Sequence, residues 1–123
     1  MTFKLSQRSL DRMKGVDERL VNVVKRAIEL SEIDFVVTEG LRTKERQTEL
    51  FKAGATRTMN SKHIVGKAVD LAALVGGSVR WDWPLYEKLA TAMKRAAEIT
   101  NTPIEWGGDW ITFKDGPHFQ LKE

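Results

Sequence analysis

The chain has 123 residues, of which 41% are hydrophobic and 30% are charged. This length and composition predict one globular domain over residues 1–123, with no second domain or linker. The absence of cysteine excludes disulfides and thiolate metal sites. Twenty Lys and Arg against seventeen Asp and Glu give a net charge of +3, but the basic residues are scattered, so we expect no nucleic acid to bind.

The first residues lack the apolar run of a signal peptide, and no later stretch reaches the length of a membrane span. We therefore expect no membrane insertion, and we expect the protein to be made and held in the cytosol. If its substrate lies outside the membrane, another protein must release it.

Two helices are predicted at the start of the chain. Residues 6–14 form the first, which ends near Gly15. Asp17 is a suitable N-cap for a longer second helix, because its side chain can accept a hydrogen bond from an amide of the first turn. The apolar residues of this helix repeat at helical spacing and are Leu20, Val23, Val24, Ala27, Ile28 and Leu30.

A strand and a third helix are predicted next. Residues 33–38 are rich in apolar and β-branched side chains and predict a strand, which ends before Arg42. Thr43 can serve as the N-cap of a helix that ends at Gly54. Residues 55–62 are polar and predict a loop.

A second strand is predicted over residues 68–72. Alternation places Asp70 on one face between two alanines, which leaves room above it, and places Val69 and Leu71 on the other face. The Gly76-Gly77 pair predicts a turn soon after this strand.

The last part of the chain is predicted to hold one helix and two short strands. Pro84 fits the first turn of a helix that reaches about residue 100. Residues 103–106 and 117–121 predict strands, with His118 and Gln120 on one face of the second. Closely spaced late strands favour antiparallel pairing, so the fold class is α+β, a small antiparallel sheet flanked by helices. The inward face of the helix is predicted to hold Leu85, Leu89, Ala92, Ala96 and Ile99.

The two histidines of the chain, His63 and His118, are candidate metal ligands. Neutral imidazole is the commonest side-chain ligand of zinc, and an aspartate oxygen is a competent third ligand. Asp70 follows His63 by seven positions with Gly66 between them, which suits a ligand, a tight turn and a ligand on the next strand. Three such ligands leave a fourth position open, as in a catalytic zinc site. Alternatively, His63 caps a loop and Asp70 accepts a hydrogen bond, and another divalent metal could replace zinc.

Asp115, three residues before His118, is a candidate general base. A carboxylate beside a metal can take a proton from water and deliver it to a leaving amine. The alternative is that Asp115 only forms a turn, because Asp-Gly is a common turn pair.

Arg42 follows a predicted strand, from which a guanidinium could reach a substrate carboxylate or a developing oxyanion, although a surface position is nearly as compatible. Gln47 and Ser61 are candidates to orient Arg42, the substrate or the ligand loop. The aromatic residues Trp106, Trp110 and Phe113 are predicted to pack in the core or line the cleft, and Trp106 is the one we assign to substrate binding.

Two sequence motifs resemble those of a known family. Ser-x-His-x-x-Gly-x-Ala-x-Asp at residues 61–70 and Trp-Gly-Gly-Asp-Trp followed by Asp-Gly-Pro-His-Phe at residues 106–119 are similar to those of zinc peptidases that cut peptidoglycan peptides. That family includes D-alanyl-D-alanine carboxypeptidases and dipeptidases, and the L-alanyl-D-glutamate endopeptidases of phage lysis cassettes. Its fold, shared with hedgehog-type domains, is an antiparallel sheet flanked by helices.

The resemblance implies a role for each candidate residue. It implies that His63, Asp70 and His118 bind Zn²⁺, that Asp115 is the general base, and that Arg42 stabilises the transition state. Asp115-Gly-Pro-His118 resembles the endopeptidase branch, whereas the carboxypeptidase branch typically has Glu-x-x-His there. Leu41 stands where the family usually has an aromatic residue.

The resulting hypothesis is a monomeric, single-domain zinc endopeptidase that cleaves the L-Ala–D-Glu bond of peptidoglycan stem peptides. We expect a phage endolysin without a separate wall-binding module. It would stay in the host cytoplasm until a separate pore-forming protein releases it to the periplasm and cell wall. The alternatives are a D-Ala–D-Ala carboxypeptidase on the same fold and a non-catalytic, zinc-binding hedgehog-like module.

Overall fold

The computed structural model describes residues 2–56, 59 and 61–123. Part of the predicted loop over residues 55–62, namely Arg57, Thr58 and Asn60, lies outside the described residues. None of the helices that the structure describes is long and apolar enough to cross a membrane.

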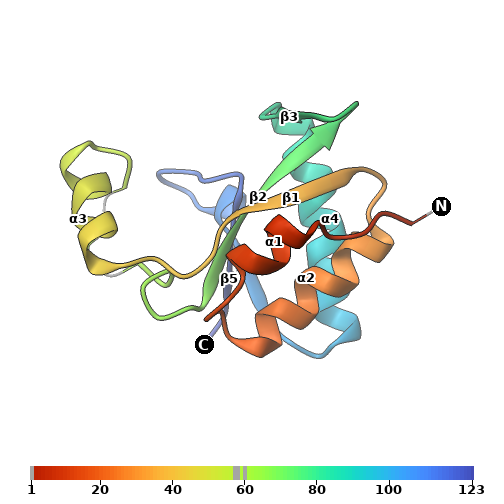
Figure 1. The fold of residues 1–123 in the computed structure, drawn as a ribbon, viewed down its shortest axis with the longest axis horizontal. Coiled ribbons are helices and arrows are strands. Elements are labelled where there is room, and N and C mark those ends of the chain that lie inside the picture. The colour runs from red at the N-terminus through yellow and green to blue at the C-terminus, as the bar shows by residue number, and fades with distance from the viewer. Residues whose placement is uncertain (1, 57–58, 60) are drawn as a thin grey trace.

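The sheet has five antiparallel strands (Figure 1). They are β1 (Asp34–Glu39), β2 (Ala68–Val75), β3 (Ser78–Arg80), β4 (Ile104–Trp106) and β5 (His118–Leu121). The order is β1-β2-β5-β4, and β3 pairs with the end of β2. The predicted α+β class with an antiparallel sheet is confirmed. The sequence did not predict β3, because its three residues are all exposed and show no alternation of burial.

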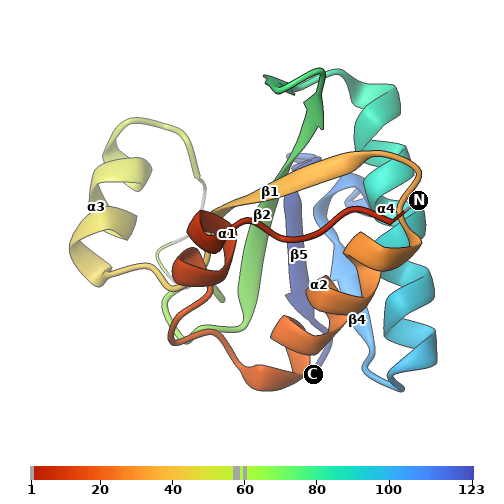
Figure 2. The ribbon, with the colours of Figure 1, turned by 45° about the vertical axis from the view of Figure 1, so that its right-hand side comes forward.

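Four α-helices and one short 3₁₀ turn surround this sheet. They are α1 (Gln7–Arg12), α2 (Glu18–Leu30), α3 (Lys44–Lys52), α4 (Trp83–Ile99) and η1 (Gly107–Asp109). Helices α2 and α4 pack against each other, and α1 lies along β1. In both ribbon views α3 stands apart from α2 and α4, on the other side of the sheet (Figures 1 and 2). One side of the sheet therefore carries the core, and the other faces α3.

Local signals set the helix ends as expected. The side chains of Asp17 and Thr43 accept hydrogen bonds from the amides of Arg19 and Arg46, which confirms both as N-caps. Gly54 follows α3 with a φ of +74°, a left-handed conformation that favours glycine.

The core lies where strand alternation predicts it. Val69 and Leu71 of β2 and Phe119 and Leu121 of β5 are buried together with the apolar faces of α2 and α4. The prediction that Ile99 faces inward is wrong, because it is 51% exposed. The buried face of α4 does not extend to Ile99, and its residues are Tyr86, Leu89, Ala90, Ala92, Met93, Ala96 and Ala97.

Candidate active site

Three neighbouring strands bring one polar residue each into a single row. Glu39 of β1 lies opposite Asp70 of β2, and Asp70 lies opposite His118 of β5. The register of β1 shifts between Val37 and Glu39, so Thr38 is the extra residue of a β-bulge. The Thr38 hydroxyl donates to the carbonyl of Asp70 at 3.3 Å. The bulge thereby places the Glu39 side chain beside those of the neighbouring strands.

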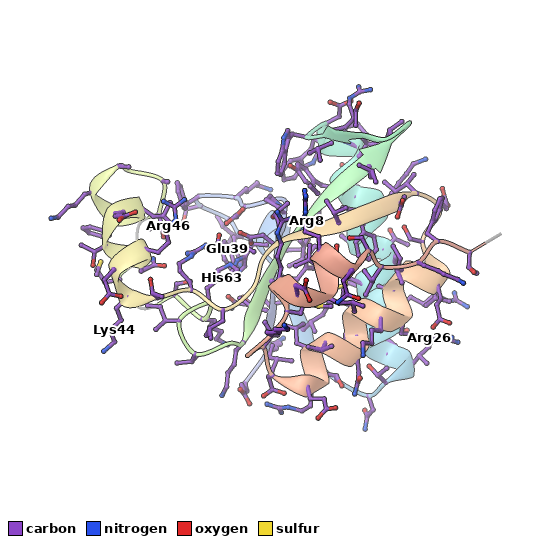
Figure 3. The ribbon with its side chains drawn as sticks, in the orientation of Figure 1. Arg8, Arg26, Glu39, Lys44, Arg46 and His63 are labelled. Carbon is purple, nitrogen blue, oxygen red and sulfur yellow. The ribbon has the colours of Figure 1, made fainter. Side chains whose placement is uncertain are left out.

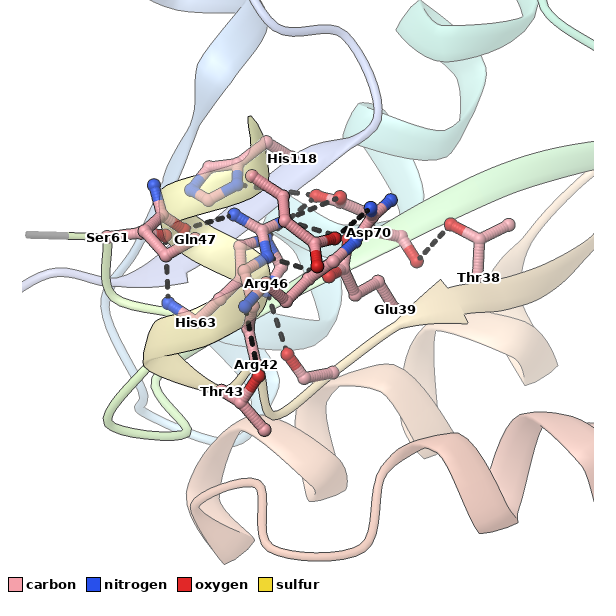
Figure 4. Close-up of polar contacts among 12 residues, drawn as sticks. Thr38, Glu39, Arg42, Thr43, Arg46, Gln47, Ser61, His63, Asp70 and His118 are labelled. Carbon is pink, nitrogen blue, oxygen red and sulfur yellow. Dashed lines mark hydrogen bonds and ion pairs between the residues drawn. The ribbon is translucent and has the colours of Figure 1, made fainter. Parts of the chain in front are cut away.

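His63, Asp70 and His118 form a compact cluster, as predicted for a metal site (Figure 4). Asp70 Oδ1 lies 3.1 Å from His63 Nε2 and 3.3 Å from His118 Nδ1. One candidate ligand atom from each residue lies within 4.8 Å of the others. The two imidazoles are buried, at 1% and 5% exposure. The chain therefore presents two nitrogen donors and one carboxylate at one point, a donor set that suits Zn²⁺.

Each histidine is oriented by a hydrogen bond on the nitrogen that faces away from Asp70. His63 Nδ1 lies 2.8 Å from the carbonyl of Gly40, so it donates there and leaves Nε2 as the ligand atom. His118 Nε2 lies 2.8 Å from Gln120 Oε1, which leaves Nδ1 toward Asp70. Metal-binding histidines generally have such a second partner, which selects the tautomer. Gln120 is a site residue that was not predicted, although strand alternation puts it on the face of His118.

The ionisable groups of this cluster shift one another's pKa values. Burial favours the neutral acid of Asp70, but hydrogen bonds from His118 and His63 outweigh it and lower the pKa of Asp70 well below its usual range. Burial also opposes a charged His118, yet its hydrogen bond to Asp70 and the negative charge of Asp70 raise the pKa of His118. Asp70 is thus ionised at neutral pH, as a metal-binding carboxylate must be.

The turn between His63 and Asp70 depends on Gly66. Its φ is +71°, and a Cβ at this position would lie 2.4 Å from the carbonyl oxygen of Gly15. Its own carbonyl accepts a hydrogen bond from the amide of Asp17 at 2.7 Å. The predicted role of Gly66 in a tight turn therefore has two causes, a left-handed conformation and a close backbone approach.

Asp115 lines the cleft beside this cluster, on a turn held by several hydrogen bonds. Its amide donates to the carbonyl of Gly107 at 3.0 Å, and Trp106 Nε1 donates to the carbonyl of Gly116 at 2.7 Å. No described residue donates a hydrogen bond to its carboxylate. Burial and the nearby charge of Asp70 raise the pKa of Asp115. A carboxylate with a raised pKa and no partner has the properties of a general base.

Arg42 is buried, at 9% exposure, and is held by two side chains. Glu39 accepts from Arg42 Nε and Nη2 at 2.7 Å each, and Gln47 Oε1 accepts from Nη1 at 2.7 Å. Burial opposes the charge of Arg42, but the hydrogen bond and charge of Glu39 raise its pKa. Gln47 orients Arg42, one of the roles considered for it. Glu39 is a site residue that was not predicted, because the bulge in β1 brings it there.

The site lies in a cleft of about 590 Å³ between the sheet and α3. Glu39 and His63 lie between these elements in Figure 3. Ser61 lines the cleft and accepts a hydrogen bond from the amide of His63 at 3.2 Å. Trp110 and Phe113 line the cleft too. Trp106, predicted to bind substrate, is not among the described residues that line this cleft. Its ring is buried against Phe119, and its Nε1 supports the turn that carries Asp115.

The sequence and the fold are similar to those of known peptidases. A family model described as phage L-alanyl-D-glutamate peptidase matches residues 1–121. The L-alanyl-D-glutamate peptidase of Listeria phage A118 is 34% identical over 98% of this chain, and the chain spans 43% of that relative's length. The structure of the Serratia marcescens L-Ala D-Glu endopeptidase ChiX superposes with a TM-score of 0.93 and 43% identity, covering 98% of this chain and 91% of ChiX.

A more distant structure shares the fold alone. The D,D-pentapeptidase VanY of a VanB-type vancomycin resistance cassette, solved in complex with Zn(II), has a TM-score of 0.60 at 18% identity, covering 86% of this chain and 72% of VanY. This match confirms the DD-peptidase-like fold class that the sequence predicts. The family match over nearly the whole chain, together with the similarity to ChiX, shows that the chain belongs to the phage L-alanyl-D-glutamate peptidase family.

Proposed function

We propose that this chain is a zinc-dependent endopeptidase that hydrolyses the L-Ala–D-Glu bond of peptidoglycan stem peptides. The observation that carries the proposal is the grouping of His63, Asp70 and His118 in one cleft with Asp115, whose carboxylate accepts no hydrogen bond from a described residue. Family membership over residues 1–121 supports the choice of bond.

Zinc would be held by His63 Nε2, the Asp70 carboxylate and His118 Nδ1, the atoms that already face one another. When bound, zinc supplies Lewis acidity, which lowers the pKa of water and polarises a peptide carbonyl. The surrounding residues keep this donor set ready, because the Gly40 carbonyl and the Gln120 amide hold the two imidazoles in the required tautomers.

The chain's own residues move the protons. Asp115 takes a proton from the attacking water, and the resulting carboxylic acid delivers it to the nitrogen of D-Glu as the bond breaks. Burial raises the pKa of Asp115, which strengthens it as a base. Arg42 lines the same cleft, where its guanidinium can stabilise the negative charge that develops on the L-Ala carbonyl oxygen.

The similarity pattern favours the endopeptidase over the carboxypeptidase. The relatives that are 34% and 43% identical are both named for the L-Ala–D-Glu bond. The D,D-pentapeptidase is 18% identical and shares only the fold. The available carboxylate of Asp115 favours an enzyme over a non-catalytic zinc module.

We propose that the protein is an endolysin that acts as a monomer on peptidoglycan. The phage origin of the 34% identical relative supports the endolysin role. We propose that it remains in the host cytoplasm until a separate pore-forming protein admits it to the periplasm and cell wall.

Mass spectrometry of digested murein tests the metal, the activity and the bond together. We expect the zinc-loaded protein to release peptides with a new N-terminal D-Glu, and a chelator to stop their release. Free D-alanine among the products, without new D-Glu termini, would instead select the carboxypeptidase.

A further inference from the structure

The described residues that line the cleft include more Asp and Glu than Lys and Arg. Three described acidic residues line it, Glu39, Asp70 and Asp115, together with two described basic residues, Arg42 and Lys62. Asp70 belongs to the metal cluster, and Asp115 is the proposed base. Arg42 and Lys62 are the described lysine and arginine residues of the cleft that can attract a negatively charged group of a substrate.

Two carboxylates already face the positive charge of Arg42. Glu39 accepts two hydrogen bonds from it at 2.7 Å, and the second carboxylate oxygen of Asp70 lies 3.8 Å from Nη2. A further carboxylate at Arg42 would therefore meet two negative groups.

Lys62 differs from Arg42 because none of the described carboxylates faces it. Its ammonium group donates to the carbonyl of Leu121 at 2.7 Å, which leaves two of its three protons free. No carboxylate of a described residue lies within ion-pair distance of it. Lys62 also lines a second hollow of about 540 Å³, and both this hollow and the cleft are lined by Ser61 and Lys62.

The backbone around Lys62 is held firmly. The Lys62 carbonyl accepts from the amide of Lys67 at 2.9 Å, and the neighbouring amide of His63 donates to Ser61. A half-buried lysine on a fixed backbone loses less freedom when it binds than a mobile surface lysine does.

The proposed substrate carries a second carboxyl group on the residue that follows the cleaved bond. Glutamate has two carboxyl groups, and only one can continue a peptide chain. The other is a free carboxylate, or an amide where it has been amidated, and it belongs to the residue whose nitrogen leaves. We propose that Lys62 binds this free carboxylate and makes the enzyme prefer D-Glu over its amidated form; this inference rests on the proposed function.

Two matched synthetic stem peptides test the proposal, one with L-Ala–D-Glu and one with the second carboxyl amidated. The readout is the ratio of kcat/KM for the acid to that for the amide. We expect the zinc-loaded wild type to favour the acid roughly tenfold, as a charge-assisted hydrogen bond predicts. Lys62→Gln should bring the ratio close to one, mainly through KM for the acid, and Lys62→Arg should retain the preference.

Lys52→Gln is the matched control, because it removes one positive charge from an exposed position of α3 outside the residues that line the cleft. It should keep the wild-type ratio. A wild type that cleaves both peptides equally would overturn the role of Lys62 even if Lys62→Gln fails to fold, and so would an equal loss on both peptides in Lys62→Gln. If the wild type cleaves neither peptide, the proposed function fails and this inference fails with it.

Discussion

Asp70 and Asp115 are two carboxylates in one cleft whose surroundings shift their pKa values in opposite directions. Both are partly desolvated, but Asp70 receives hydrogen bonds from two imidazoles, which lower its pKa. Asp115 has no such partner, and burial together with the charge of Asp70 raises its pKa. When the surroundings of two similar groups shift their pKa values apart in this way, the two groups suit different chemical roles. Asp70 suits a permanently ionised ligand, and Asp115 suits a group that gains and loses a proton.

Asp115→Asn should separate turnover from metal binding. The amide keeps the shape of the side chain but cannot accept a proton, so we expect turnover to fall by roughly 10²–10⁴-fold. Zinc content, measured by mass spectrometry of the purified protein, should not change, because the three ligands are intact. His118→Ala is the control and should lose zinc as well as activity. Full activity in Asp115→Asn would exclude Asp115 as the base.

Glu39→Gln tests how much the buried Arg42 depends on its partner. The substitution preserves shape but leaves the guanidinium without a full counter-charge, so we expect the free energy of unfolding to fall by about 1–3 kcal/mol. Urea unfolding measures this change. Glu49→Gln removes the partner of Arg46 in an exposed pair at 3.3 Å and serves as the matched control. It should change stability by less than about 0.5 kcal/mol, and equal losses in the two variants would contradict the special role of Glu39.

At the scale of elements, the site depends on irregularities in otherwise regular strands and turns. The bulge at Thr38 directs Glu39 into the row with Asp70 and His118. The turn at Gly66 brings the chain from His63 back into β2. A regular strand or a wider turn would leave the same side chains elsewhere, so these local departures position the chemistry.

Gly66→Ala should destabilise the protein far more than Gly54→Ala. The two glycines have similar left-handed φ values, +71° and +74°. A Cβ at Gly66 would lie 2.4 Å from a backbone oxygen, whereas nothing lies within 4 Å of one at Gly54. We expect a loss of about 1–2 kcal/mol at Gly54 from conformation alone, and about 1–3 kcal/mol more at Gly66 from overpacking. Thermal unfolding of the two variants side by side would show the difference, and equal losses would exclude the contact as its cause.

At the scale of the whole molecule, the metal cluster joins parts of the fold that are distant in sequence. His63 comes from a loop, Asp70 from β2 and His118 from β5. A ligand that needs all three positions binds the folded chain in preference to the unfolded chain and therefore stabilises it.

Zinc should accordingly raise the melting temperature of the wild type. At a free concentration of a hundred times Kd, the expected stabilisation is about 2.7 kcal/mol. Differential scanning calorimetry with zinc and with chelator measures the shift without any assay of activity. His118→Ala should abolish most of this shift, and a shift that survives the substitution would place the metal elsewhere.

A second long-range connection joins the start of α2 to the end of the chain. Arg19 pairs with Asp17 and Glu123, and Lys67 also pairs with Glu123. Hydrogen bonds from the side chain and backbone of Arg19 lower the pKa of Asp17 from 3.8 to about 2. The ionised form therefore contributes stability above the unfolded pKa, and this contribution disappears as the pH falls through about 2.

Asp17→Asn should isolate this charge, because asparagine remains a good N-cap. We expect the variant to be less stable than the wild type at pH 6, and the two to become equally stable as the pH falls toward 2. Chemical denaturation across this pH range measures the difference. A difference that stayed constant down to pH 2 would show that the charge of Asp17 is not its source.

Much of the fold could be predicted because its signals are local. The N-caps Asp17 and Thr43 act on amides within three residues of themselves. The alternation in β2 and β5 assigns Val69 and Phe119 to the core without knowledge of their partners. Strand β3 was missed and Ile99 was misplaced, because an exposed strand has no pattern and the end of an amphipathic helix is set by what it packs against.

The sequence by itself determined the donor types, their order and the turns between them, because side-chain chemistry and short-range spacing belong to the chain alone. The tertiary structure decided which side chains meet. It paired Glu39 with Arg42, put Gln120 behind His118 and buried Trp106 away from the cleft. These contacts depend on strand register, on one bulge and on packing across the sheet. Such interactions act through space between distant residues, and spacing along the chain does not specify them.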